Sequence, residues 1–358
     1  MTQNKKLMVG VLFLLTLSCS VRAEPSSKLL WAGVLFRHGD RTPTAALPKH
    51  PYPWHQGLGQ LTARGMHQEY LLGQSLRERY VQRYSLVEPQ FSVSELYVRS
   101  TDKDRTLMSA SSLLYGLYPP GSGPKLDTGQ DALPGGFQPI PIHTVLRSRD
   151  PLLRPQELHH KEIYKLQQHY VYASPTWQRT EQSLGKYFAN WSRVSGFEID
   201  SLQSAKKFAS NLYIRSLHQI PLPAGLSPIE LKALIPLAGW IHAEQFKPYP
   251  VGVVVGGPWL REVSMQMQAY LKGSSSVRLR LYSAHDTNIL GVMSALREPL
   301  STNPPYASRI QAELFRRQGH DRVEFRYNGQ PIALPCSLNG RSCSLERFIQ
   351  YVAGLKPG

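Results

Sequence analysis

Three apolar stretches of the chain each end close to a group of polar, charged side chains. Residues 29–36 are almost entirely apolar, which is typical of a β-strand that is covered on both faces. Residues 96–98 form a shorter run, and residues 277–282 alternate between apolar side chains and arginines, as strands do. The pattern therefore predicts three strands, each of which leads directly into a polar segment.

A helical pattern follows each of these strands. Residues 63–80 repeat apolar side chains at helical spacing, and Thr62 provides an N-terminal cap. Residues 104–117 and 287–296 show similar patterns. Strand, polar segment and helix thus occur three times, which predicts an α/β fold with a mixed, mostly parallel central sheet flanked by helices. Because ligands of open α/β sheets bind beyond the carboxyl ends of the strands, we expect the three polar segments to converge.

The middle of the chain has a different pattern. Residues 119–141 are rich in proline and glycine, and we interpret them as a loop. Residues 156–240 are mostly helical in pattern and contain many aromatic side chains, which we interpret chiefly as core packing.

The first 23 residues have the pattern of an export signal. Lys5 and Lys6 precede an apolar stretch over 7–17, and Val21-Arg22-Ala23 fits a cleavage site. The stretch is too short to span a bilayer comfortably, and a lipid anchor at Cys19 is a weaker alternative. We therefore expect a signal peptide over 1–23, no stable membrane insertion and an exported protein. It would be periplasmic or secreted, or lysosomal or extracellular in a eukaryote.

The net charge is strongly positive, at +16. Such a charge favours anionic substrates or surfaces. The basic residues are spread along the chain, and zinc-finger spacings and aromatic RNA-binding signatures are absent from it, so we expect no nucleic-acid partner. The sequence is compatible with a homodimer and does not determine the oligomeric state. Asn190-Trp191-Ser192 is a glycosylation site only if the host is eukaryotic.

Two of the three cysteines lie after the expected signal peptide. Cys336 and Cys343 flank Asn339-Gly340, a pair that favours a turn. In an oxidising compartment this spacing indicates a local disulfide. A metal site is disfavoured here because no histidine lies near the pair in sequence.

The most distinctive motif follows the first predicted strand and runs from Arg37 to Pro43. Arg37 and Arg41 flank His38 within five residues, on a segment that contains a glycine and a proline. Arginine presents a planar fork of donors that matches phosphate oxygens. A histidine held between two such forks is placed to attack a bound phosphorus atom. The alternative interpretation of the motif is a basic surface turn.

Three segments together resemble a known family. Residues 37–43 read R-H-G-D-R-T-P, residues 97–110 read Y-V-R-S-T-D-K-D-R-T-L-M-S-A, and residues 282–287 read Y-S-A-H-D-T. In this order they resemble the histidine acid phosphatases, branch 2 of the histidine phosphatase superfamily, and most closely the prostatic and lysosomal type. The resemblance implies a phosphoglycerate mutase-like α/β domain over 24–120 and 241–358, with a mostly helical domain inserted over 121–240.

The same resemblance and the chemistry of phosphate esters suggest a role for each polar side chain. We expect His38 to be the nucleophile that forms a phosphohistidine, and Asp286 to be the general acid for the leaving alcohol. The phosphoryl oxygens would be bound by Arg37, Arg41, Arg99 and His285. Arg105 is left out of this set because it is equally able to pair with Asp102, and Asp40 is expected to orient a neighbouring arginine.

These features predict an acid phosphatase that hydrolyses small phosphate monoesters with broad specificity and needs neither a metal nor another cofactor. The chain lacks G-x-S-x-G, H-E-x-x-H and P-loop motifs, which disfavours serine hydrolases, zinc proteases and nucleotide triphosphatases. Two alternatives stay open. One is a phytase or other inositol-phosphate phosphatase, and the other is a non-catalytic polyanion-binding protein on the same fold.

Overall fold

A computed structural model describes residues 27–338 and 340–357. Within these residues a seven-stranded sheet has the order β2-β3-β1-β4-β5-β6, and β7 pairs with β5. The strands are β1 (Ser27–Arg37), β2 (Leu96–Ser100), β3 (Leu279–Ala284), β4 (Arg309–Arg317), β5 (His320–Tyr327), β6 (Gln330–Ile332) and β7 (Cys343–Ser344).

The mixed α/β sheet flanked by helices is confirmed, but its pairing is more antiparallel than expected. Strands β2, β3 and β1 are parallel neighbours, whereas β1–β4, β4–β5, β5–β6 and β5–β7 are antiparallel. The reason is local, because very short turns at Gln318-Gly319 and Asn328-Gly329 join β4 to β5 and β5 to β6. All four turn residues have positive φ, which favours tight hairpins and therefore antiparallel pairing.

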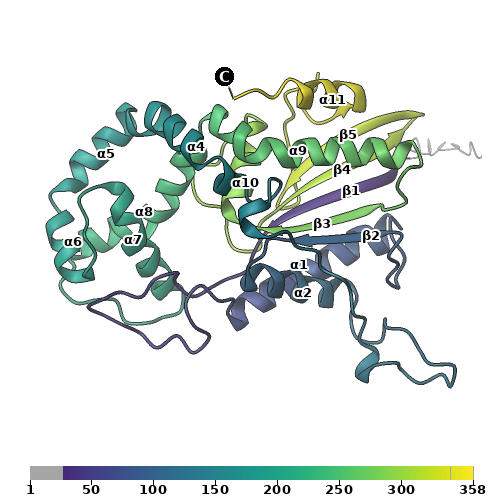
Figure 1. Ribbon diagram of the computed structural model, residues 1–358, viewed down its shortest axis with the longest axis horizontal. Helices are drawn as coiled ribbons and strands as arrows, with labels where there is room; N and C mark the ends of the chain where they lie inside the picture. Colours follow the sequence, from purple (N-terminus) through teal and green to yellow (C-terminus); the bar gives the residue numbers. More distant parts are fainter. Residues whose placement is uncertain (1–26, 339, 358) are drawn as a thin grey trace, which may run out of the picture.

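The helices lie in two groups (Figure 1). They are α1 (Ala63–Arg77), α2 (Asp104–Leu117), α3 (Pro155–Leu158), α4 (His160–Gln167), α5 (Pro175–Gly185), α6 (Phe188–Ser195), α7 (Leu202–Leu217), α8 (Pro228–Phe246), α9 (Tyr249–Leu271), α10 (Asp286–Ala295) and α11 (Leu345–Ala353). Helices α1 and α2 cover one face of the sheet and α9 and α11 the other, while α4 to α8 form a separate group beside it (Figure 1).

The strand–helix pattern of the sequence is confirmed at all three places. Strands β1, β2 and β3 coincide closely with the predicted runs, and α1, α2 and α10 follow them. Thr62 caps α1 as expected, because its hydroxyl accepts a hydrogen bond from the backbone N–H of Gly65 at 3.1 Å.

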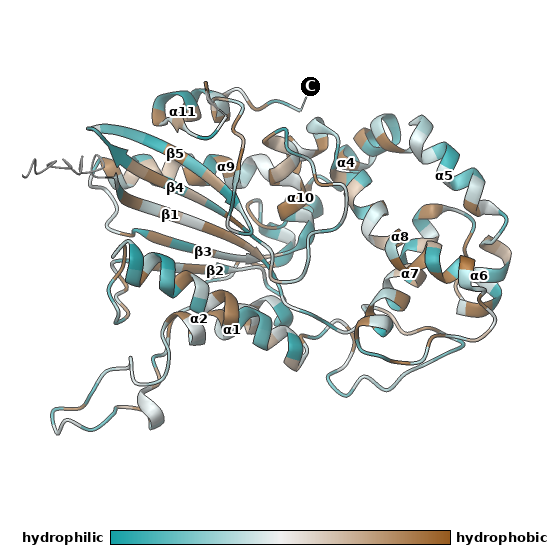
Figure 2. Cartoon of the chain, turned by 180° about the vertical axis from the view of Figure 1, so that it is seen from behind, coloured by the Kyte–Doolittle hydropathy of each residue, from teal (hydrophilic) through white to brown (hydrophobic). Residues whose placement is uncertain are grey.

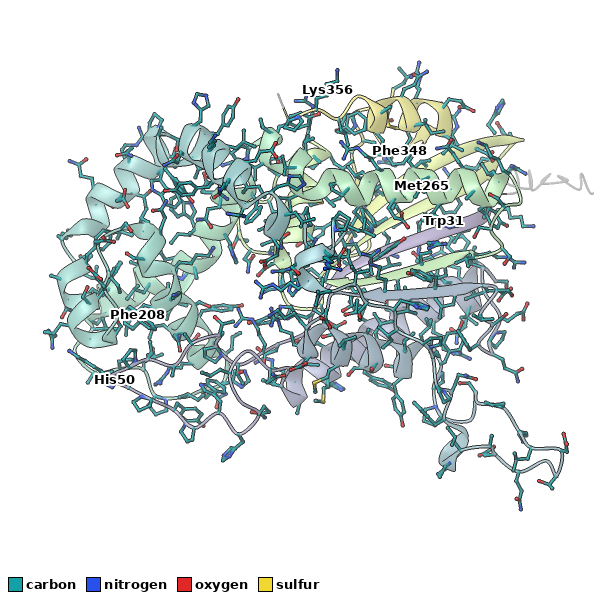
Figure 3. All side chains as sticks on the ribbon, viewed as in Figure 1. Trp31, His50, Phe208, Met265, Phe348 and Lys356 are labelled. Atoms are coloured by element: carbon teal, nitrogen blue, oxygen red, sulfur yellow. A yellow bond between two sulfur atoms is a disulfide. The ribbon has the colours of Figure 1, made fainter. Side chains whose placement is uncertain are left out.

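Each group of elements has its own apolar core. Trp31 on β1 is fully buried between the sheet and α9, and Phe208 on α7 is fully buried in the helical group (Figure 3). Trp177 and Trp191 belong to that helical core, as the sequence indicated, whereas Tyr164 is half exposed. Figure 2 shows the outlying helix α5 as mostly hydrophilic.

The division of the chain into 24–120 plus 241–358 and 121–240 stays a prediction. In the structure the first helix of the second group, α4, begins at His160, and its long helix α8 ends at Phe246. The preceding stretch stays with the sheet: His143 bridges β2, and Leu153 packs in the core beside β1. The proline- and glycine-rich loop itself projects away from the sheet (Figure 1).

Cys336 and Cys343 form the expected disulfide, with their Cα atoms 5.6 Å apart. The signal peptide predicted over 1–23 lies outside the described residues. In the part of the chain that the structure describes, no helix has both the length and the apolar character needed to cross a membrane.

Glu69 is an unusual buried residue on the inner face of α1. Its side chain is fully buried, and neither carboxylate oxygen has a hydrogen-bond partner among the described residues. Burial raises the pKa of this carboxyl well above its usual value, since an ionised carboxylate is poorly solvated there.

We therefore expect Glu69 to favour folding most at acid pH. A carboxyl whose pKa is raised in the folded state contributes stability that is fully present below its unfolded pKa, at about 4.3, and that is lost as the pH rises through the folded pKa. The free energy of unfolding of wild type minus that of Glu69→Gln should decrease from pH 4 to pH 8. Chemical denaturation of both proteins across this range measures the difference, and a pH-independent difference would contradict the assignment.

Candidate active site

The carboxyl ends of β1 and β3 lie side by side and bring two of the three motifs together. Arg37 is the register partner of Ala284, and the backbone N–H of His38 donates to the carbonyl of Ala284 at 3.0 Å. Because the two strands are parallel, the residues that follow them leave the sheet at the same edge. The rings of His38 and His285 lie 5.5 Å apart, centroid to centroid, and nearly perpendicular.

The His38 ring is buried and oriented by the backbone of the next residue, Gly39. Its Nδ1 lies 2.8 Å from the carbonyl oxygen of Gly39, which only accepts hydrogen bonds, so Nδ1 carries the proton. In the neutral ring the lone pair is then on Nε2. Burial and the charges of Arg105, Arg37 and Arg41 lower the pKa of His38 well below its usual value, which outweighs the opposite effect of the Gly39 carbonyl. The His38 ring therefore stays neutral at acid pH, with the Nε2 lone pair unprotonated.

The loop that carries His38 is fixed against α1 and α7. A Cβ atom on Gly39 would lie 2.3 Å from the carbonyl oxygen of Gly65, so only glycine permits this close approach. Asp40 is fully buried, and its Oδ2 lies 2.6 Å from the Thr62 hydroxyl and 2.7 Å from Nε2 of His218. Asp40 thus holds the loop to two helices, rather than orienting a neighbouring arginine as expected.

Arg37 and Asp286 form a buried ion pair at the site. The distance from Nη2 of Arg37 to Oδ2 of Asp286 is 3.1 Å, and Asn303 donates to the same oxygen at 3.1 Å. Burial alone would raise the pKa of Asp286, but Arg37, with His242 and His38, holds it well below its usual value. Arg37 also lies over the Tyr306 ring, 4.2 Å from its centroid, and donates to the carbonyl of Pro304.

His285 caps the start of α10 and faces Arg105. The backbone N–H of His285 donates to the Asn288 side chain at 3.2 Å, which fixes the first turn of the helix. Nε2 of His285 lies 3.0 Å from the Thr101 hydroxyl, and Nδ1 lies 3.5 Å from Nη2 of Arg105. Burial, followed by the charge of Arg105, lowers the pKa of His285 well below its usual value, so this ring is neutral too.

Arg105 was left out of the predicted set, but it lies with the other site residues. Its guanidinium is close to His285, and its charge acts on His38 more strongly than that of Arg37 or Arg41. Burial lowers the pKa of Arg105 to about 10, which leaves it charged at neutral and acid pH. Asp102, the partner considered from the sequence, is exposed.

Arg99 was included in the predicted set, but its guanidinium is paired elsewhere. Its Nη2 lies 2.5 Å from Oδ1 of Asp150, a fully buried carboxylate that also accepts from the backbone N–H groups of Leu152 and Leu153. This pairing ties β2 to the segment before α3. The structure therefore brings His38, Arg37, Arg41, His285 and Asp286 together and leaves Arg99 with Asp150.

A signal for Arg105 was present in the chain. His285 and Asp286 lie at the N-terminus of a helix rather than on the preceding strand, and Arg105 occupies the corresponding first turn of α2. If site residues lie at the start of the helix that follows each strand, Asp286 is selected on α10 and Arg105 on α2. The arginine expected from the sequence, Arg99, lies on β2 instead.

A cavity of about 270 Å³ opens beside the charged cluster. Arg37, Arg41 and Asp286 form one part of its wall, and residues of α7, α8 and the loop 302–306 form the remainder. His242 of α8 reaches Asp286, with 3.6 Å between Nδ1 and Oδ2, and burial together with the charge of Lys206 lowers its pKa to about 3. The cavity therefore has room for part of a small molecule that reaches the charged cluster.

The chain is similar in sequence to a known family and to several of its members. Residues 28–220 and 247–328 match the family model of the histidine phosphatase superfamily (branch 2). The chain is 33% identical to prostatic acid phosphatase of Bos taurus, over 99% of this chain and 92% of that protein. It is 32% identical to lysosomal acid phosphatase of Bos taurus, over 92% of this chain and 78% of that protein.

The fold is also found among solved structures. The apo form of Hafnia alvei phytase superposes with a TM-score of 0.67 at 18% identity, and the match covers 93% of this chain and 98% of that one. At this identity the likeness concerns the fold alone, whereas the family model matches most of the chain in sequence and the acid phosphatases match nearly all of it. This protein therefore belongs to branch 2 of the histidine phosphatase superfamily.

Proposed function

We propose that this protein is an acid phosphatase that hydrolyses phosphate monoesters through a phosphohistidine on His38. The observation that carries the proposal is the His38 ring, whose Nδ1–H is held by Gly39 so that the lone pair of Nε2 is free, beside three arginines and a carboxyl group. Membership of the family makes the protein a phosphoric monoester hydrolase.

The reaction has two steps: the phosphoryl group is transferred first to His38 and then from His38 to water. The Nε2 lone pair of His38 attacks phosphorus, the N–P bond forms as the bond to the alcohol oxygen breaks, and the Asp286 carboxyl gives its proton to that oxygen. Water then attacks the phosphohistidine and passes a proton to the Asp286 carboxylate. The N–P bond breaks, inorganic phosphate leaves with the proton that Asp286 received, and His38 is neutral and Asp286 ionised again, as in the free protein.

The phosphoryl oxygens are bound by Arg37, Arg41, Arg105 and His285. Fixed guanidinium groups in a buried site stabilise the charge of the transferring group and need little rearrangement during the reaction. Arg105 takes the role expected of Arg99, because its guanidinium is close to His38 and His285 while Arg99 is held by Asp150. When phosphate binds, Arg37 contacts two anionic groups, the Asp286 carboxylate and the phosphoryl group.

The proton for the leaving group arrives with the substrate at acid pH. Asp286 is ionised in the free protein because Arg37 lowers its pKa. A phosphate ester has a second pKa of about 6, so below this pH it binds as a monoanion that can pass its proton to Asp286. His38 stays neutral in the same range. We therefore expect kcat/KM to fall as the pH rises above about 6.

Replacing Asp286 with asparagine should have an effect that depends on the leaving group. Asparagine keeps the shape and the hydrogen bond to Asn303 but cannot supply the proton, so esters of poorly acidic alcohols should lose the most activity. A loss of about 10²–10⁴-fold is expected for an alkyl phosphate and a smaller one for 4-nitrophenyl phosphate. The slope of log kcat/KM against alcohol pKa should steepen. Equal losses across the series would show that Asp286 has only a structural role.

The substrate range should favour small and aromatic monoesters over phytate. The cavity wall includes Tyr213, Tyr306 and Ile235, whose side chains suit flat or apolar groups. It contains few cations beyond those that face the phosphoryl group. A panel of aryl phosphates, phosphotyrosine and phytate, assayed at pH 5 with and without chelator, tests this range. Higher kcat/KM on phytate than on aryl phosphates would favour the phytase alternative. Absence of phosphate release from every ester would favour the non-catalytic alternative.

Export is part of the same proposal. The disulfide between Cys336 and Cys343 suits an oxidising compartment, and the relatives include lysosomal acid phosphatases. A periplasmic or secreted location would place the enzyme among phosphate esters outside the cytosol. Glycosylation of Asn190 and a homodimer stay predictions.

A further inference from the structure

One face of α7 contributes three polar side chains to the wall of the cavity. Lys206, Ser210 and Tyr213 follow at spacings of four and three residues, which places them on the same side of the helix. Phe208 and Leu212 are buried in the helical core instead. The packing of α7 therefore directs an ammonium, a hydroxyl and a phenol group toward the space beside Asp286.

The charge of Lys206 has no ionic partner in close contact. Its Nζ donates to the neutral amide oxygen of Gln245 at 2.7 Å, and among residues 27–338 and 340–357 no carboxylate oxygen lies within 4.0 Å of it. Burial lowers the pKa of Lys206 to about 8, against the attraction of the more distant Asp286. The ammonium is thus charged at neutral and acid pH, in surroundings that lack the anion such a group normally requires.

Lys206 lies in the wall of the cavity that the leaving alcohol would occupy. Asp286 must lie beside the oxygen that departs, so the alcohol part of the substrate occupies the cavity that Asp286 and Lys206 both line. The other wall, from α8, is largely apolar and includes Ile235 and Pro236. A leaving group that fits these walls combines an apolar body with an acidic substituent.

We propose that Lys206, with Ser210 and Tyr213, forms a subsite for a single anionic group on the leaving alcohol, and that the preferred substrates are monoesters of hydroxy acids, aromatic ones included. This inference rests on the proposed phosphatase function and narrows its substrate class. Arg37 and Arg41 face the phosphoryl group, so Lys206 is the remaining ammonium or guanidinium in the described cavity wall. One cation matches one carboxylate and leaves most charges of phytate without partners.

The test compares two nearly isosteric substrates. The ratio of kcat/KM for carboxyphenyl phosphate to that for carbamoylphenyl phosphate reports on the charge of the substituent, and the 3- and 4-isomers are both assayed. For the better isomer, the ratio should fall at least about tenfold in Lys206→Met, since a hydrogen bond to a charged group contributes about 1.5–3 kcal/mol. Lys206→Arg should keep most of the ratio. Lys207→Met, on the exposed side of α7, is the matched control and should leave it unchanged.

Binding of carboxybenzyl and carbamoylbenzyl phosphonates, measured by calorimetry, adds a readout that does not need turnover. Tighter binding of the carboxylate in wild type, lost in Lys206→Met, supports the subsite. Equal effects of Lys206→Met on both substrates, or equal binding of both phosphonates by wild type, would overturn it. Absence of phosphate release combined with selective binding of the carboxylate would instead contradict the phosphatase function and leave the subsite supported.

Discussion

Replacing His38 with alanine is expected to abolish turnover and leave the fold intact. The ring is the proposed nucleophile beside Arg37, Arg41 and Arg105, and removal of a nucleophile typically costs at least about 10⁴-fold in kcat. The ring makes a single side-chain hydrogen bond, to the adjacent Gly39, so little structure depends on it. Steady-state kinetics and thermal melting of the variant measure the two effects separately.

The covalent intermediate gives a direct test of the same assignment. Wild type mixed with a labelled aryl phosphate and quenched without acid should retain phosphate on His38, and His38→Ala should retain none. His320→Ala, at an exposed position on β5, is the matched control and should behave as wild type. Label on a serine or aspartate, or substantial turnover by His38→Ala, would rule out His38 as the nucleophile.

Replacing Arg105 with methionine should lower kcat/KM far more than the same change at Arg99. Arg105 is close to both catalytic-site histidines, and loss of one fixed donor to a transition-state oxyanion costs about 10²–10³-fold. Arg99→Met should change kcat/KM of the folded protein only a few-fold. It should instead destabilise the fold by about 3–5 kcal/mol, because Asp150 is then a buried carboxylate without its partner.

A double variant separates the two roles of these arginines. Arg99→Met combined with Asp150→Asn removes the uncompensated charge and should recover part of the lost stability, as seen in urea denaturation. No change at Asp150 should restore the activity of Arg105→Met. If Arg99→Met abolished turnover with unchanged stability, Arg99 rather than Arg105 would be the phosphate ligand.

The parts of the site that depend on short-range sequence were predictable. His38 and its two flanking arginines occupy one turn, so their proximity follows from the chain itself, and Asp286 follows a strand whose apolar pattern is clear. The disulfide was predictable for the same reason, because Cys336 and Cys343 are seven residues apart. In each case the neighbours that matter lie close along the chain.

The choice between Arg99 and Arg105 could not be made in this way. The two arginines are six residues apart at the junction of β2 and α2, and either guanidinium group is able to bind phosphate. The decision depends on Asp150, more than forty residues further along the chain, which binds Arg99 at 2.5 Å and leaves Arg105 to the site. A distant buried carboxylate has no signature in the local pattern.

The sequence by itself determined the family and the strand–helix order of the core, and it predicted the chemistry of the His38 motif, because these depend on periodicity and on residues adjacent in the chain. Tertiary structure alone decided which arginine lies beside His285 and which side chains line the cavity. Lys206 lies in a helical pattern like many others, and only the packing of α7 against α8 places its charge in the cavity beside Asp286. Such contacts join elements far apart in sequence, and their free energy comes from burial and charge that arise only after the chain has folded.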